Sequence, residues 1–117
     1  KRVAMKDLAP GIFRKRQIIE ARIRTPIDGD TISEYLSALS PVLGMKTIAD
    51  PVSHLSDKYG WAAWIHWETS GAHVYAWDHP ELFVSIDIYT CKDYDSRKAL
   101  LFTQEFFDVS DIECRDV

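Results

Sequence analysis

Apolar and polar residues alternate along several stretches of the chain, a pattern typical of half-buried β-strands. The segment 17–25 (QIIEARIRT) places aliphatic side chains on one side and charged side chains on the other. The segment 46–54 is predicted as a weak edge strand, because Pro51 has no amide hydrogen to donate to a neighbouring strand. Further strands are predicted over 61–69, 72–77, 82–91 and 109–114.

Two other segments repeat their apolar residues at helical spacing. The first begins at Thr31, which with Glu34 has the spacing of a capping box, and ends at Gly44. The second is predicted over 95–107, with Asp95 or Ser96 as its N-cap.

This order of elements predicts one α+β domain over residues 17–117. Its expected architecture is a two-layer sandwich, in which two helices cover one face of a largely antiparallel sheet and leave the other face open. Residues 1–16 have no clean period and are interrupted by Pro10 and Gly11, so we expect a flexible basic arm there. A chain of 117 residues is long enough for one modest core.

Charge is unevenly distributed along the chain. Residues 1–24 hold eight of the 14 Lys and Arg residues against two acidic ones, a net charge of +6, and the remainder carries −10. The arm contains no recognised nucleic-acid motif, so we expect no nucleic-acid binding, and the acidic body suits a cationic ligand. No apolar run of about 20 residues is present, so we expect no membrane contact and a cytoplasmic location. Cys91 and Cys114 form no zinc motif, and we expect free thiols.

The hairpin around residues 67–77 (WETSGAHVYAW) carries the candidate chemistry. With Ser70-Gly71 as a two-residue turn, one face is apolar and belongs to the core, with Ala63, Ile65, Trp67, Val74 and Ala76. The other face collects aromatic and ionisable residues from three strands: Trp64, His66, Glu68, His73, Tyr75, Trp77, Phe83, Ser85, Asp87, Tyr89 and Cys91.

Two interpretations of this open face stand side by side. Exposed aromatics are typical of a subunit interface, so we expect a homo-oligomer, either dimer or trimer. A site can also form where two such faces meet. A metal site from His66, Glu68 and His73 is the weaker interpretation, because such pairs occur often by chance, and we expect no metal.

Residues 60–107 resemble the small bacterial-type S-adenosylmethionine decarboxylases. Ser85-Ile-Asp-Ile-Tyr-Thr-Cys91 followed by Asp95-Ser-Arg-Lys-Ala-Leu100 is similar to that family's Val-Asp-Ile-Phe-Thr-Cys strand and the start of its last helix. Trp77, Pro80 and Glu81 look like the family's Trp-Pro-Glu turn, lengthened here by two residues.

The resemblance implies a self-processing site that this chain has partly lost. In the family, a Ser that follows a Glu becomes a pyruvoyl group, which forms a Schiff base with the substrate; a His and a Cys assist. Ser70 falls at the position of that Ser and Cys91 matches the Cys. Thr69 replaces the Glu, Tyr75 replaces the His, and Ala62 lies where the family keeps another Ser. We therefore expect no cofactor, with a pyruvoyl group from Ser70 only under the alternative below.

Three functions follow from the resemblance. The first is pyruvoyl-independent cleavage of S-adenosylmethionine into methylthioadenosine and homoserine lactone, similar in its requirements to the S-adenosylmethionine lyases that phages carry, so a phage origin fits. The second is a decarboxylase self-processed at Ser70, and the third is a non-catalytic homologue that binds S-adenosylmethionine or a partner subunit. The predicted catalytic residues are Glu68, Ser70, Tyr75 and Cys91, and the predicted substrate-binding residues are Tyr59, Trp64, His66, His73, Trp77 and Asp87.

Overall fold

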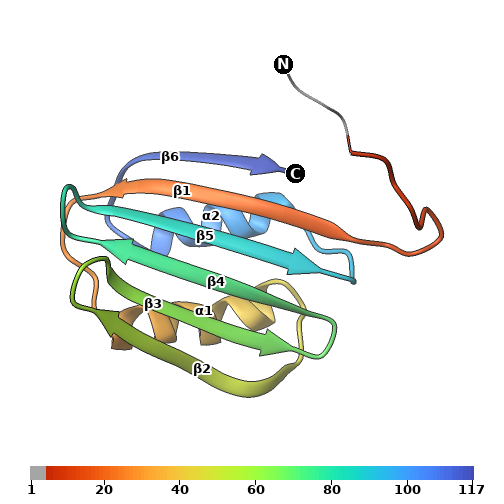
Figure 1. The fold of residues 1–117 in the computed structure, drawn as a ribbon, viewed down its shortest axis with the longest axis horizontal. Helices are drawn as coiled ribbons and strands as arrows, with labels where there is room; N and C mark the ends of the chain where they lie inside the picture. The colour runs from red at the N-terminus through yellow and green to blue at the C-terminus, as the bar shows by residue number, and fades with distance from the viewer. Residues whose placement is uncertain (1–4) are drawn as a thin grey trace.

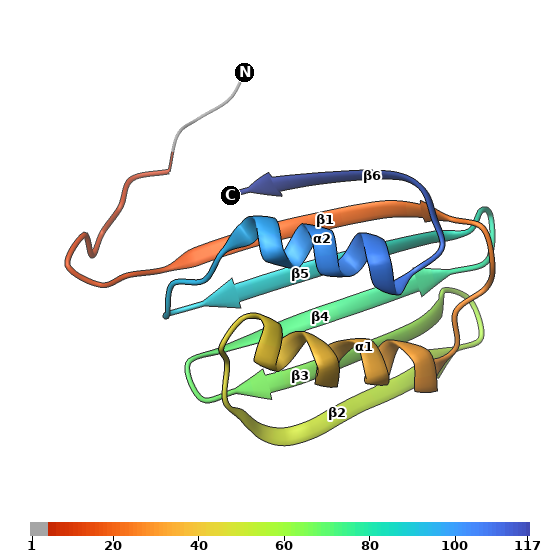
Figure 2. The same ribbon diagram turned by 180° about the vertical axis from the view of Figure 1, so that it is seen from behind.

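Six strands form one sheet in the order β2-β3-β4-β5-β1-β6, and every neighbouring pair is antiparallel. The computed structural model describes residues 5–117. Both helices lie on the same face of the sheet (Figures 1 and 2). The elements are β1 (Lys15–Ile23), α1 (Gly29–Val42), β2 (Thr47–Ser56), β3 (Gly60–Trp67), β4 (Ser70–Trp77), β5 (Phe83–Thr90), α2 (Ser96–Phe106) and β6 (Val109–Asp116). The predicted two-layer α+β architecture is confirmed.

The core lies between the sheet and the two helices. The residues predicted to face it from the β3–β4 hairpin are all buried, and Trp67 is the largest fully buried side chain. The Trp67 indole Nε1 donates to Ser40 Oγ at 2.7 Å, and the buried Tyr35 hydroxyl is 2.6 Å from Thr103 Oγ1. These bonds satisfy polar groups that would be costly to bury alone. Between residues 5 and 117, no helix is long and apolar enough to cross a membrane.

The ends of the helices correct one prediction and confirm two. Helix α1 begins at Gly29, with Asp28 as its N-cap, and Asp28 Oδ1 accepts a hydrogen bond from the Thr31 amide at 2.9 Å. The expected capping role of Thr31 is therefore wrong, because the helix begins earlier and Thr31 lies in its first turn, where its amide is the one that is capped. Gly44 ends this helix in the left-handed region, with φ of 69°. Asp95 caps α2 as expected, by accepting from the Arg97 amide at 2.9 Å.

The β3–β4 hairpin has a different register from the predicted one. Trp67 pairs with Ser70 and Trp64 pairs with His73, so Glu68 and Thr69 form the turn in place of Ser70 and Gly71. The partner of each β3 residue is therefore shifted by four positions from the prediction. Since side chains alternate with a period of two, an even shift leaves each residue that remains in a strand on the face that was predicted for it.

The chain outside the predicted domain also differs from expectation. Strand β1 begins at Lys15, two residues inside the segment predicted as a flexible arm. The first four residues of that arm lie outside the described part of the chain. Strand β6 pairs with β1 at the edge of the sheet, so the two ends of the domain are adjacent strands.

The β2–β3 turn depends on Gly60. Its φ is 93°, and a Cβ atom there would collide with the carbonyl oxygen of Ala76 on β4. Gly44 also has a positive φ, but a Cβ there meets nothing within 4 Å.

We expect the two glycines to respond differently to substitution. Gly44→Ala should lower the free energy of unfolding by about 1–2 kcal/mol, the cost of left-handed backbone for a residue with a Cβ. Gly60→Ala should cost clearly more, because strand β4 must also move away. Urea unfolding followed by tryptophan fluorescence measures both, and equal losses would contradict this explanation.

Candidate functional site

The open face of the sheet carries a continuous row of rings along β4. Successive ring centroids are 6.4, 6.3, 6.2 and 5.5 Å apart, and we call these residues the aromatic row: Trp64, His73, Tyr75, Trp77 and Phe83. Trp64 and Tyr75 are 45% and 43% exposed although both are large aromatics. The prediction that aromatic residues gather on the open face of the sheet is confirmed.

Charged residues occupy the neighbouring part of the open face, on β1 and β5. Arg16 donates to both carboxylate oxygens of Asp87, at 3.0 Å from Nε and 2.7 Å from Nη2. This pairing raises the pKa of Arg16. The main cause is the hydrogen bond to Asp87, and the second is the negative charge of Asp87. Asp87, a predicted substrate-binding residue, therefore already has an ionic partner in the single chain.

A second group lies at the end of the sheet where β3 turns into β4. Ser70 pairs with Thr90, and the Cys91 amide donates to the Thr69 carbonyl at 2.9 Å. The structure thus brings the backbones of Ser70 and Cys91 close together, although twenty residues lie between them in the sequence. We call Glu68, Thr69, Ser70 and Cys91 the turn-end group.

Glu68 belongs to the turn and not to a strand face, which corrects its predicted position. Its amide donates to the Lys46 carbonyl at 2.9 Å, and its carboxylate is 3.5 Å from Lys46 Nζ. Both side chains are mostly exposed, so this ion pair contributes little to stability. The Glu68 carboxylate is therefore free to exchange Lys46 for another cation.

The surroundings of Ser70 lack the groups that self-cleavage needs. Its hydroxyl lies 2.9 Å from the Thr69 hydroxyl and 3.7 Å from the sulfur of the buried Met45. Within residues 5–117, neither a carboxylate nor an imidazole hydrogen-bonds to it. Tyr75, at the position of the family's His, lies five residues further along β4 on the opposite face, about 16 Å away at the usual strand rise.

The remaining predicted residues lie toward the other end of the sheet. Tyr59 precedes Gly60, which lies beside Trp77 at the end of β4. Trp77 is seven residues from Ser70 along the same strand, which corresponds to about 23 Å. One small molecule on a single chain therefore cannot touch both the turn-end group and the Tyr59–Trp77 end.

The three residues of the weaker metal interpretation do not converge. His66 pairs with Gly71, Trp64 pairs with His73, and Glu68 is in the turn. Across the described residues, no three His, Cys, Asp or Glu side chains gather in a way that could hold a metal ion.

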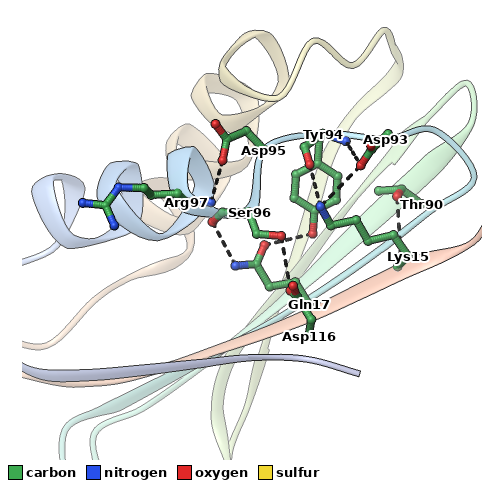
Figure 3. A network of polar contacts seen from close by, with 9 residues as sticks. All are labelled: Lys15, Gln17, Thr90, Asp93, Tyr94, Asp95, Ser96, Arg97 and Asp116. Atoms are coloured by element: carbon green, nitrogen blue, oxygen red, sulfur yellow. Dashed lines mark hydrogen bonds and ion pairs between the residues drawn. The ribbon is translucent and has the colours of Figure 1, made fainter.

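A polar network that sequence reasoning missed anchors the loop after Cys91 (Figure 3). The Tyr94 hydroxyl donates to Gln17 Oε1 at 2.9 Å, and Gln17 Nε2 donates to the Ser96 carbonyl at 3.0 Å. Lys15 Nζ lies 4.3 Å from the centre of the Tyr94 ring and donates to the Tyr94 carbonyl at 2.5 Å. Burial, followed by the charge of Asp116, raises the pKa of Tyr94, so its hydroxyl stays protonated as a donor.

One signal in the sequence could have revealed this network. Gln17 occupies a core-facing position of β1, in line with Ile19 and Ala21, and it is fully buried. A polar residue in such a position requires buried partners.

We expect Tyr94→Phe to lower the free energy of unfolding by about 1–3 kcal/mol, because it leaves the buried oxygen of Gln17 without a donor. Tyr89→Phe is the matched control, since Tyr89 is 53% exposed. Thermal and urea unfolding measure both. A Tyr94→Phe protein as stable as Tyr89→Phe would refute the anchoring role.

Comparison with known proteins identifies the family and supports the fold of this chain. The model of the S-adenosylmethionine decarboxylase family matches residues 23–117. The fold is similar to that of the adenosylmethionine decarboxylase from Aquifex aeolicus VF5, with a TM-score of 0.68 and 15% identity over 91% of this chain and 89% of that one. No curated protein sequence matches the chain. The match over most of its length shows that the chain belongs to the S-adenosylmethionine decarboxylase family.

Proposed function

We propose that this protein cleaves S-adenosylmethionine without a pyruvoyl group, by intramolecular displacement. The carboxylate of the substrate attacks its own γ-carbon while the bond from that carbon to the sulfonium sulfur breaks. The sulfur keeps the bonding electrons and leaves as the neutral thioether of methylthioadenosine, and the carboxylate closes to homoserine lactone. The observation that carries this proposal is the environment of Ser70, which offers no acid or base for self-cleavage.

The displacement suits the groups that remain on this chain. The sulfonium is a good leaving group, so the reaction depends mainly on holding the methionine chain folded in attack geometry. The faces of Trp and Tyr rings attract a cation, and the aromatic row offers several of them. Glu68 supplies a carboxylate for the substrate's amino group or for the sulfonium.

The site requires a second copy of the chain. Glu68 and the Tyr59–Trp77 end are too far apart within one chain, and the aromatic row is exposed. Packing the open faces of two copies against each other brings the turn-end group of one copy toward the Tyr59–Trp77 end of the other. This arrangement also covers the exposed rings, in a homo-oligomer of two or three chains.

We assign roles to the predicted residues on this basis. Glu68 binds the amino group or the sulfonium, Tyr75 and Tyr59 position the methionine part, and Trp64 and Trp77 stack on the adenine or face the cation. Of the remaining predicted residues, His66 and His73 line the open face, Asp87 is held by Arg16, and Ser70 and Cys91 are adjacent at the turn end.

Incubating the pure protein with S-adenosylmethionine and separating the products tests the reaction. We expect methylthioadenosine and homoserine lactone in equal amounts, with no carbon dioxide. Release of carbon dioxide with the decarboxylated substrate would refute the proposal.

A second candidate is a pyruvoyl-dependent decarboxylase, which the neighbouring backbone positions of Ser70 and Cys91 favour. Intact-mass measurement separates the two candidates. We expect a single chain of unprocessed mass, whereas two fragments divided between Thr69 and Ser70 would establish self-processing.

Glu68→Gln should lower turnover by about 100-fold or more, because a preorganised charge that faces a reacting cation contributes strongly to rate. Glu105→Gln is the matched control, since Glu105 is an exposed carboxylate on α2, on the helix side of the sheet. Binding of S-adenosylmethionine without turnover in the original chain, unchanged by Glu68→Gln, would instead indicate the non-catalytic homologue.

A further inference from the structure

The N-terminal arm, residues 5–14, presents apolar side chains to solvent. It leaves β1 at Lys15 and runs beyond the end of its own sheet in both views (Figures 1 and 2). The exposed fractions of its large apolar residues are Met5 90%, Leu8 85%, Ile12 61% and Phe13 47%. Apolar side chains this exposed on one short segment indicate a contact with another molecule.

Hydrogen bonds between residues of the arm itself fix its conformation. Arg14 donates to the carbonyls of Ala9 and Ile12 at 2.6 and 2.7 Å and to Asp7 Oδ1 at 2.8 Å. Asp7 Oδ1 also accepts a hydrogen bond from the Ala9 amide at 2.9 Å. The hydrogen bond from Arg14 is the main cause that lowers the pKa of Asp7, and the bond from the Ala9 amide is the second. The turn therefore exists before any partner binds, which reduces the entropy lost on binding.

The open side of β1 and β6 offers a complementary surface. It contains two shallow depressions of about 150 and 230 Å³, and both are lined by Glu20 and Glu113. These two carboxylates lie directly opposite each other in the sheet, an unfavourable pairing of like charges. Phe83 and Ile18 add apolar contact area, and Arg115 lies at one edge.

Glu20 and Glu113 differ from the other acidic residues on this side of the sheet. Asp87 and Asp111 are paired with Arg16 and Arg22, at 2.7 and 3.2 Å. Among residues 5–117, neither Glu20 nor Glu113 forms an ion pair, and Glu20 accepts a hydrogen bond only from the neutral Ser85 hydroxyl. A cation from outside the chain would relieve their repulsion.

The charges of the whole chain point to the source of that cation. Residues 1–16 hold six Lys and Arg residues and one Asp, a net charge of +5, and residues 17–117 carry −9. Within residues 5–13 the charged side chains are Lys6 and Asp7; because Asp7 is paired with Arg14, Lys6 is the cation that this segment can offer to the acidic body of another copy.

We propose that residues 5–13 of one copy dock across β1 and β6 on the open face of a second copy. Lys6 faces Glu20 and Glu113 of that copy, and the apolar side chains of the arm cover Phe83 and Ile18. The contact does not depend on the proposed reaction, so assembly without substrate and turnover with substrate report on the two proposals separately.

Sedimentation equilibrium of the full chain without substrate tests the docking. We expect an oligomer at micromolar concentration, and deletion of residues 1–13 should raise its dissociation constant at least ten-fold. Leu8→Ser with Ile12→Ser should have a similar effect, whereas Leu101→Ser, at a 42% exposed position on α2, should have none. A monomeric full chain, or unchanged assembly after the deletion, would overturn the proposal.

A charge exchange tests the partner of Lys6. Lys6→Glu and Glu113→Lys should each weaken assembly by at least three-fold, and the two together should restore it. Failure of the double variant to recover would refute this pairing. Binding of anionic lipid vesicles or of DNA that requires the arm, with assembly unaffected by its deletion, would assign the arm to a membrane or a nucleic acid instead.

Discussion

Burial of one sheet face beneath two short helices is the constraint on which the rest of this structure depends. Strands β3, β4 and β5 alternate strictly, so each apolar residue that packs against α1 or α2 places its neighbours on the other face. Because Ile65, Val74 and Ile86 are buried, Trp64, His73 and Tyr75 must lie on the open side. The aromatic row is thus a direct consequence of how the core is built.

The length of the strands then determines what this face can do. Trp77 lies seven residues along β4 from Ser70, about 23 Å, which is more than one small ligand spans. The face is also nearly flat, with shallow depressions and no deep cavity at the described residues of β1 and β6. Binding pockets for small molecules usually enclose most of the ligand, and in the proposed function a second copy provides the missing walls.

The surroundings of Ser70 are the observation on which the proposed change of chemistry rests. The hairpin keeps the backbones of Ser70 and Cys91 on neighbouring strands, but the Ser70 hydroxyl contacts Thr69 and the sulfur of Met45, whereas Cys91 is exposed. A thioether and a second hydroxyl are poor proton acceptors at neutral pH. A reaction that needs no proton transfer, driven by the departure of a sulfonium, fits such a site better than one that must first build a cofactor.

The sequence by itself determined the elements, the fold class and the face of the residues that lie within the strands, with Glu68 as the exception, because these depend on the local period of apolar residues. It also indicated the helix stop at Gly44 and the cap at Asp95, which are local backbone requirements. The tertiary structure alone decided the register of the β3–β4 hairpin, which moved Glu68 from a strand into the turn. It also decided the pairing of β6 with β1 and the network of Gln17 and Tyr94. These features depend on contacts between residues far apart in the chain, and periodicity carries no information about which distant segments meet.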